Sequence, residues 1–308
     1  MVYIDTIGSY IPENYLNNIY EAEKNNKDLN WLENSIGVLK TPKKNQNESV
    51  LTMCINAYKN LKSKTKVLEK EIDLIVLISQ NTDNSSLPQQ STQLQSELNI
   101  SNKAASFDIS LGCSGYVYGL NIVESMMISN AYRSALLFTC DPYSDIINEF
   151  DFSNKLLFGD ASTVTYITSK PKRDLLLTPK SFKHYSHGQY SEYLMKKNQG
   201  LHMDGRKIFS FVKKEVFREL DEFIAETNQP IDLIIPHQAS QLTLNQFVTH
   251  FNKRVEIAID IKNTGNTVSS SIPLILKNYL NNMMYDNLVL AGFGVGMSSS
   301  YSYLERKK

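Results

Sequence analysis

The chain has 308 residues, of which 42% are hydrophobic, and its 32 basic and 32 acidic side chains cancel to a formal net charge of zero. This length suits one or two compact units, and the balanced charge argues against nucleic-acid or anionic-membrane binding, which needs a basic excess. Three cysteines imply no disulfide framework, and neither a membrane span nor a signal peptide is recognisable, so we expect a cytoplasmic protein.

Alternating strands and helices are predicted through the first half of the chain. A buried strand over 71–78 is followed by a helix over 89–98, a strand over 104–109, a helix over 114–129 and a strand over 134–139. Such alternation predicts parallel strands with helical crossovers, and therefore an α/β fold.

The second half repeats this order of elements. The motif Ile-Asp-Leu-Ile at 72–75 recurs at 231–234, an offset of 159 residues. A strand over 230–236 is then followed by a helix over 241–251, a strand over 254–260, a helix over 270–280 and strands over 287–291 and 300–304.

The repeat predicts two duplicated βαβαβ units packed against each other. We place the N-terminal half at 1–165 and the C-terminal half at 166–308. The segments 10–50 and 141–210 lie outside the repeat, are rich in Asn, Lys and Tyr, and are predicted to be loop or cap insertions.

Cys113 is the first candidate for chemistry. It stands between a predicted strand and a predicted helix, and Gly112 and Gly115 beside it leave room for a substrate. The positive end of a helix dipole and the free N–H groups there favour a thiolate, the form that attacks carbonyl carbons. The alternative, a buried cysteine that only fills space, is retained for Cys54 and Cys140.

His237 is the second candidate, because it follows the apolar run 233–236 and so stands at the end of a predicted strand. Open α/β sheets place their ligands at such ends. The other four histidines lie in polar stretches typical of the protein surface: His184, His187, His202 and His250.

Asn266 is the third candidate. Through the repeat, its loop corresponds to the loop of Cys113, and pseudo-twofold packing of the halves would bring the two loops together. An amide there can donate a hydrogen bond to a developing enolate oxygen. Taken alone, the segment 263–266 would be interpreted as an ordinary turn.

A glycine-rich loop over 291–300 follows the predicted strand near the C-terminus. It resembles a dinucleotide-binding fingerprint, but a strand rather than a helix follows it. We interpret it as a loop whose backbone N–H groups approach an oxyanion.

Together these motifs resemble the β-ketoacyl-acyl-carrier-protein synthase III family, the initiating ketosynthases of the thiolase superfamily. The resemblance runs nearly end to end, and the order and spacing of its motifs are specific. It rests on segments 7–12, 112–115, 158–160, 205–209, 236–239, 265–267, 271–273 and the terminal glycine loop.

The resemblance implies an α/β, thiolase-like fold with α-β-α-β-α layers. It also implies that an acyl thioester, acyl-CoA or acyl carrier protein, acylates Cys113. A malonyl thioester would then lose CO2 beside His237 and Asn266, and its carbanion would attack the acyl-cysteine. Backbone N–H groups of Cys113, Val295 and Gly296 would bind the oxyanion.

The resemblance implies further binding residues. Trp31 would stack on the CoA adenine, and Phe152, Phe158 and Phe209 would contact the substrate. Leu87 would reach into the acyl pocket of a second subunit, so a homodimer is expected.

Several family arginines are missing around the entrance to the site, at Ser35, Leu39, Phe152 and Leu242. A lost charge-assisted phosphate contact costs about 1–3 kcal/mol. The losses favour a specialised biosynthetic pathway over housekeeping fatty-acid initiation.

The sequence therefore predicts a decarboxylating ketosynthase that needs neither metal nor bound cofactor. One alternative is a thiolase-fold acyltransferase that moves an acyl group to a hydroxyl or amine without decarboxylation. A second is a non-catalytic partner subunit of a ketosynthase heterodimer, although inactive partners usually lose the nucleophile.

Overall fold

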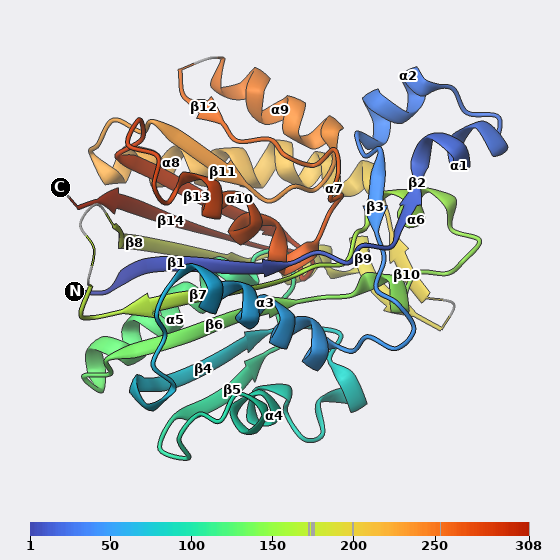
Figure 1. Cartoon of the computed structure of the whole chain (residues 1–308). Coiled ribbons are helices and arrows are strands. Elements are labelled where there is room, and N and C mark those ends of the chain that lie inside the picture. Colours follow the sequence, from blue (N-terminus) through green and yellow to red (C-terminus); the bar gives the residue numbers. More distant parts are fainter. Residues whose placement is uncertain (172, 174–175, 199, 253, 308) are drawn as a thin grey trace.

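The computed structural model describes residues 1–171, 173, 176–198, 200–252 and 254–307. Fourteen strands are found in this part of the chain, and ten of them form one large sheet (Figure 1). In the order in which they lie side by side, the ten are β12 (Glu256–Ile257), β11 (Leu233–Pro236), β13 (Asn287–Gly294), β14 (Ser298–Arg306), β8 (Leu177–Ser186), β1 (Tyr3–Tyr10), β7 (Ser162–Thr168), β6 (Ser134–Cys140), β4 (Ile72–Ile78) and β5 (Ala105–Ile109).

Helices cover this sheet, and two small hairpins stand apart from it. The hairpin strands are β2 (Tyr15–Asn17) with β3 (Lys40–Pro42), and β9 (Leu194–Lys197) with β10 (Gly200–Met203). The helices are α1 (Asn18–Lys24), α2 (Leu29–Trp31), α3 (Val50–Lys64), α4 (Gln90–Glu97), α5 (Gly115–Ser129), α6 (Phe152–Leu157), α7 (Gly205–Phe211), α8 (Phe217–Thr227), α9 (Gln241–Phe251) and α10 (Ser271–Tyr279).

The order of strands is symmetric about the junction of β1 and β8. Strands β5, β4, β6, β7 and β1 on one side correspond to β12, β11, β13, β14 and β8 on the other, and one residue pair, Ile4 with Leu177, joins the two half-sheets. This is the arrangement expected of a duplicated unit. The division at 165/166 stays a prediction, and β7 runs across that position.

Alternation along the strands creates the layers. In β4, Leu74 and Val76 pack into a core that also contains residues of β11 and β13, whereas Ile75 and Leu77 pack into a separate core with α3. Helices α5 and α10 contact strands of both half-sheets, α3 and α4 cover the N-terminal half-sheet, and α8 and α9 cover the C-terminal one. The predicted α-β-α-β-α layering is therefore confirmed.

Most predicted elements form within one or two residues of their predicted bounds, and the helix over 241–251 matches α9 at both ends. Two expectations were wrong. Of the strand predicted over 254–260, only the two residues of β12 are extended in the sheet. The segment 141–210 is not only loop and cap, because it contributes the sheet strands β7 and β8. These two strands were missed because their sequences are rich in Thr and Lys. They form because each of them pairs with a strand on both sides.

The segment 10–50 does form a cap. Helices α1 and α2 lie with α6 at the end of the molecule opposite to the two chain termini (Figure 1). The buried side chain of Asn18 fixes this cap, because its amide donates to Val38 O at 2.9 Å, Thr41 Oγ1 at 2.9 Å and Leu156 O at 2.8 Å. Among the helices described, none is long and apolar enough to cross a membrane.

The Asn18→Ala substitution should lower the free energy of unfolding by about 1–3 kcal/mol, because it leaves a buried carbonyl without its donor. Urea denaturation measures the change. The matched control is Asn34→Ala, whose exposed amide makes one bond to its own helix, and which should change stability by less than about 0.5 kcal/mol. Equal effects of the two substitutions would contradict this role of Asn18.

Candidate active site

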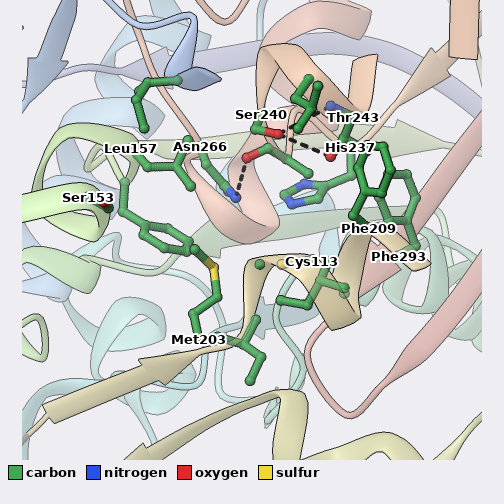
Figure 2. Close-up of a pocket in the computed structure, with 18 of the residues that line it drawn as sticks. Cys113, Ser153, Leu157, Met203, Phe209, His237, Ser240, Thr243, Asn266 and Phe293 are labelled. Carbon is green, nitrogen blue, oxygen red and sulfur yellow. Dashed lines mark hydrogen bonds between the residues drawn. The ribbon is translucent and has the colours of Figure 1, made fainter. Parts of the chain in front are cut away.

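An apolar cavity of about 190 Å³ lies where the loops of the two halves meet (Figure 2). Cys113, His237 and Asn266 all line it, and each follows a different strand. Two further predicted residues, Phe158 and Phe209, line it as well. Sequence reasoning therefore identified five residues of this cavity.

Cys113 lies in the short connection between β5 and α5. The glycine loop between β13 and β14 packs directly against it, because a Cβ on Gly294 would lie 2.8 Å from the Cys113 sulfur. Gly294 has a φ of 150°, which side-chain-bearing residues rarely adopt. Only glycine at this position allows the loop to approach the sulfur so closely.

Backbone N–H groups face the Cys113 sulfur. The N–H groups of Val295 and of Cys113 itself stabilise the thiolate and so lower the pKa of the Cys113 thiol. The loop is held in place by Ser298, whose hydroxyl donates to Val295 O at 3.1 Å and contacts Ser114 Oγ at 2.8 Å. No such contact involves Gly296, so its predicted part in binding an oxyanion stays a prediction.

Burial nevertheless outweighs these contacts and raises the pKa of the Cys113 thiol to about 12, with the nearby Asp141 carboxylate adding to the rise. The expectation that Cys113 would favour the thiolate is therefore wrong for the resting protein. The dipole of α5 begins only after Ser114, and burial of the sulfur disfavours an isolated charge more than one helix end can offset.

His237 is fully buried at the end of β11. Burial lowers its pKa to about 3, so the imidazole is neutral at physiological pH. Its Nδ1 lies 2.6 Å from Ser271 Oγ, and the Gln238 N–H also points to this oxygen. A Ser271 hydroxyl that donates to Nδ1 leaves the ring proton on Nε2, where it can be donated to a substrate.

Asn266 presents its amide nitrogen to the cavity. Its Oδ1 accepts the Val268 N–H at 2.9 Å, which assigns the other amide atom as nitrogen, and this nitrogen donates to Ala239 O at 3.3 Å. Val268 adopts a φ of 52°, a strained conformation for a β-branched residue. The strained residue lies two positions after Asn266, where the loop must turn to hold this amide orientation.

Trp31 and Phe152 lie at the rim and not in the cavity. Their rings stack on each other with centroids 5.9 Å apart and planes inclined by 15°. Ser35 and Ser153, close to them in sequence, line the entrance. Because the two rings already contact each other, an adenine must either part them or stack on an outer face.

Among the described residues that line the cavity, none is a lysine or an arginine. Lys27 lies over Trp31, with its Nζ 5.6 Å from the ring centroid. Leu242 lines the entrance with 47% of its surface exposed, so an apolar side chain meets the incoming substrate there. Leu242, one of the positions where a family arginine is missing from the sequence, thus lies at the entrance as an apolar side chain.

Leu87 lies away from the cavity, on the loop between β4 and α4, with 83% of its surface exposed. A large apolar side chain in this position suits a contact with another subunit. The predicted contact and the homodimer stay predictions.

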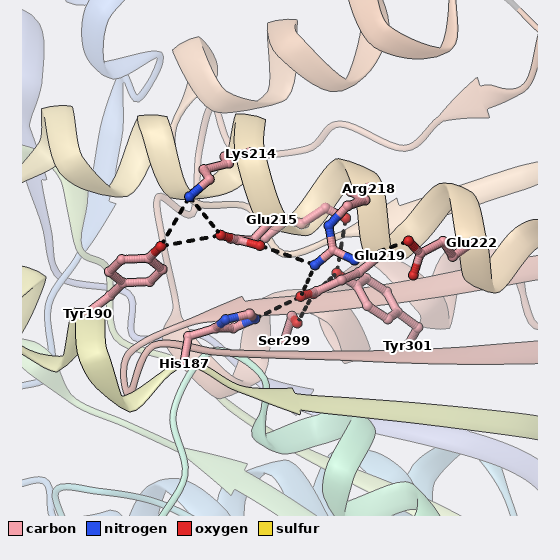
Figure 3. Close-up of polar contacts among 10 residues, drawn as sticks. His187, Tyr190, Lys214, Glu215, Arg218, Glu219, Glu222, Ser299 and Tyr301 are labelled. Atoms are coloured by element: carbon pink, nitrogen blue, oxygen red, sulfur yellow. Dashed lines mark hydrogen bonds and ion pairs between the residues drawn. The ribbon is translucent and has the colours of Figure 1, made fainter.

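One further cluster among the described residues has the side chains of a metal site: His187, Glu215 and Glu219 (Figure 3). These groups already have partners. Glu219 is bonded to His187 at 2.7 Å and to Ser299 at 2.5 Å, and Arg218 pairs with Glu215 at 3.1 Å. The geometry fits an ion-pair network that ties α8 to β14, and the absence of a metal stays a prediction.

Sequence reasoning missed several residues of the site. They are Ser271, which contacts His237, and Asp141, whose buried carboxylate accepts the Ser269 hydroxyl at 2.5 Å. The glycine loop was predicted as a whole, but the places of Phe293 and Gly294 in the cavity wall were not. The run of three serines over 269–271, at the start of a helix and close to Asn266, could have indicated the contacts that Ser269 and Ser271 make.

Comparison with known proteins gives consistent matches. The family model described as 3-oxoacyl-acyl-carrier-protein (ACP) synthase III matches residues 107–180, and the model for its C-terminal region matches residues 225–305. The β-ketoacyl-acyl-carrier-protein synthase III of Aquifex aeolicus is 30% identical over 275 residues, covering 87% of each chain.

Two further relatives match over nearly the whole length. The enzyme of the same name from Neisseria gonorrhoeae is 26% identical over 312 residues, covering 96% of each chain. A crystal structure of a 3-oxoacyl-(acyl-carrier-protein) synthase III superimposes with a TM-score of 0.90 at 25% identity, covering 99% of both chains.

The raised pKa of Cys113 predicts how its alkylation depends on pH. A thiol whose pKa is raised stays protonated until high pH, so the iodoacetamide rate at Cys113 should climb about tenfold per pH unit from 7 to 10. Peptide mapping by mass spectrometry follows the rate, and Cys113→Ser gives the background from Cys54 and Cys140. A plateau between pH 7 and 9 would show a stabilised thiolate instead.

The Ser271→Ala substitution should slow any step that needs a proton from His237 Nε2. The rate of such a step should fall about tenfold or more, because a positioned proton donor accelerates a reaction by a factor of about 10² to 10⁴. Decarboxylation of a malonyl thioester measures this step. Acylation of Cys113 and the melting temperature are the controls, and a parallel loss in all three would mean that Ser271 is only structural.

Proposed function

The chain belongs to the 3-oxoacyl-acyl-carrier-protein synthase III family of acyl-transferring ketosynthases, and we propose that Cys113, His237 and Asn266 perform its chemistry. The observation that carries the proposal is that these three side chains, which come from three separate loops, line one apolar cavity. A thiol, a neutral imidazole and an amide are the groups that a decarboxylative condensation requires.

In the first half-reaction the Cys113 sulfur attacks the carbonyl carbon of an acyl thioester. The bond to the donor sulfur breaks, and the thiol proton of Cys113 ends on that leaving sulfur, so no net charge is created. The carbonyl oxygen turns towards the N–H groups of Val295 and Cys113, which already face the sulfur. Because the Cys113 thiol is protonated at rest, proton transfer accompanies the attack, and the proton passes to the leaving sulfur.

In the second half-reaction a malonyl thioester binds with its thioester oxygen between His237 and Asn266. Loss of CO2 leaves an enolate, whose negative oxygen accepts hydrogen bonds from the imidazole Nε2 and the Asn266 amide nitrogen. Both donors are neutral and held by their own partners, Ser271 and Val268, so they need little reorganisation.

The enolate carbon then attacks the acyl carbon on Cys113. A carbon–carbon bond forms, the bond from that carbon to the cysteine sulfur breaks, and the released thiolate takes one proton from solvent, which balances the carboxylate lost as CO2. The product is a β-ketoacyl thioester. Cysteine, imidazole, amide and backbone N–H groups cover every step, so we propose that no metal or cofactor takes part.

The partners are proposed from the family and from the rim. The relatives carry acyl carrier protein in their names, and we propose an acyl-CoA or acyl carrier protein as donor and a homodimer formed at the face of Leu87. The absence of lysine and arginine from the described lining of the cavity supports a specialised biosynthetic pathway over housekeeping fatty-acid initiation.

Two substitutions should separate the half-reactions. Cys113→Ala should abolish acylation and condensation but retain malonyl decarboxylation, because His237 and Asn266 stay in place. Asn266→Ala should retain acylation of Cys113, seen as an acyl mass on the intact protein, and lose condensation by about 10² or more.

The matched control for the second substitution is Asn263→Ala in the same loop, outside the cavity. It should leave both half-reactions within about twofold of the unmodified protein. Condensation by Asn266→Ala at the unmodified rate would disprove the role of Asn266, and absence of any acyl mass at Cys113 across CoA and carrier-protein donors would disprove the proposed function.

A further inference from the structure

Glu219 is a buried charged side chain to which the proposed chemistry gives no role. It lies on α8 with none of its surface exposed, on the helix face that also buries the apolar residues Phe217, Leu220 and Phe223. Removing a carboxylate from water is costly, and an apolar side chain of similar size often replaces a buried ion pair at no loss of stability. Packing alone therefore does not account for a carboxylate at this position.

Two hydrogen bonds connect this carboxylate to the start of β14 (Figure 3). Its Oε2 atom accepts the Ser299 hydroxyl at 2.5 Å and the Tyr301 hydroxyl at 3.1 Å. Both residues lie on the same face of the strand, because side chains alternate along it. Ser299 is the second residue of β14, so Glu219 holds this strand at the point where the glycine loop ends.

The other carboxylate oxygen is connected to the same loop through His187. Glu219 Oε1 lies 2.7 Å from His187 Nε2, and the backbone N–H of His187 donates to Met297 O at 2.8 Å. Met297 is fully buried and directly precedes β14. Glu219 is therefore linked to both neighbours of Ser298, directly to Ser299 and through His187 to Met297.

Ser298, between these two residues, continues the connection to the nucleophile. Its hydroxyl donates to Val295 O at 3.1 Å and contacts Ser114 Oγ at 2.8 Å. The N–H of Val295 faces the Cys113 sulfur. A series of hydrogen bonds and short backbone segments thus runs from Glu219 to the N–H group that would bind the oxyanion.

The glycine loop needs such contacts from outside, because its own backbone has little conformational preference. Gly294 and Gly296, on either side of Val295, have φ values of 150° and 130°, in a region that glycine enters freely. A donor stabilises an oxyanion only when it is held at hydrogen-bond distance, and a displacement of about 1 Å can slow a reaction about 10²-fold.

We propose that Glu219 is a positioning residue for acyl transfer, and that it fixes the glycine loop so that the Val295 N–H meets the oxyanion formed at Cys113. The proposal rests on the proposed function, because it requires that this N–H group binds the oxyanion. It applies to acylation and to condensation, the two steps in which a tetrahedral oxyanion forms. Decarboxylation of a malonyl thioester does not depend on the loop, because its enolate oxygen is bound by His237 and Asn266.

The test compares Ser299→Ala with the matched control Ser302→Ala. Both substitutions change a buried serine of β14, but the Ser302 hydroxyl has no hydrogen-bond partner among the described residues, whereas Ser299 loses its bond to Glu219. Ser299→Ala leaves Glu219 its contacts with His187 and Tyr301, so the protein should still fold. Melting temperatures check this.

Two rates are measured in each variant. One is the gain of an acetyl mass at Cys113 from acetyl-CoA, or from acetyl carrier protein if only that donor labels the unmodified protein. The other is the release of CO2 from the corresponding malonyl thioester in the absence of an acyl donor.

Ser299→Ala should lower the maximal acylation rate about tenfold or more. The donor concentration that gives half of this rate should change little, because the loop binds the carbonyl oxygen more strongly in the transition state than in the ground state. Release of CO2 should stay within about twofold of the unmodified protein, and Ser302→Ala should change neither rate by more than about twofold.

Two variants of Glu219 separate hydrogen bonding from charge. Glu219→Gln keeps an oxygen that can accept both hydroxyls, so its acylation rate should stay within about threefold of the unmodified protein. Glu219→Leu keeps a side chain of similar volume but removes the acceptor, so it should lower the acylation rate as Ser299→Ala does and retain the release of CO2.

The outcomes distinguish this proposal from the function on which it rests. If Ser299→Ala is acylated as fast as Ser302→Ala, or if its acylation and its release of CO2 fall together, the positioning role is wrong and the proposed function stands. Equal losses in Glu219→Gln and Glu219→Leu would contradict a role through hydrogen bonds. If no acetyl donor labels the unmodified protein, the proposed function fails and the role of Glu219 fails with it.

Discussion

The burial of Cys113 and His237 at the junction of the two halves is the constraint on which the rest of the site depends. It raises the pKa of Cys113 and lowers that of His237, so the nucleophile and its neighbour are both neutral at rest. Charge appears only during the reaction, on a carbonyl or enolate oxygen. Fixed donors around a buried, apolar cavity stabilise such transient charge far better than water-exposed ones do.

The fold makes this junction possible by bringing the ends of β5, β11 and β13 together. Glycine at 294 lets the last of these loops approach the Cys113 sulfur, and the strained Val268 turns the Asn266 amide towards the cavity. The core between the half-sheets contains α5 and α10, the helices that follow Cys113 and Asn266. The same packing that joins the halves therefore fixes the distances within the site.

The sequence predicted the elements that follow from apolar periodicity and the residues that stand at strand ends. Cys113, His237 and Asn266 were found in this way, since the repeat places their loops together. It did not predict the protonation state of Cys113, because desolvation depends on how completely the cavity is closed. Nor did it predict the Trp31–Phe152 stack or the sheet strands β7 and β8, which rest on contacts between distant segments.

The central claim is that the protein forms a carbon–carbon bond between an acyl group and a malonyl unit, with loss of CO2, and does not simply transfer an acyl group. The direct measurement supplies an acetyl thioester and a malonyl thioester labelled with ¹³C in the free carboxylate, and follows the label by mass spectrometry. The account predicts that all label leaves as CO2 and that an unlabelled β-ketoacyl thioester forms in equal amount. A product that retains the labelled carboxylate, or acyl transfer to a hydroxyl or amine without release of CO2, would contradict it.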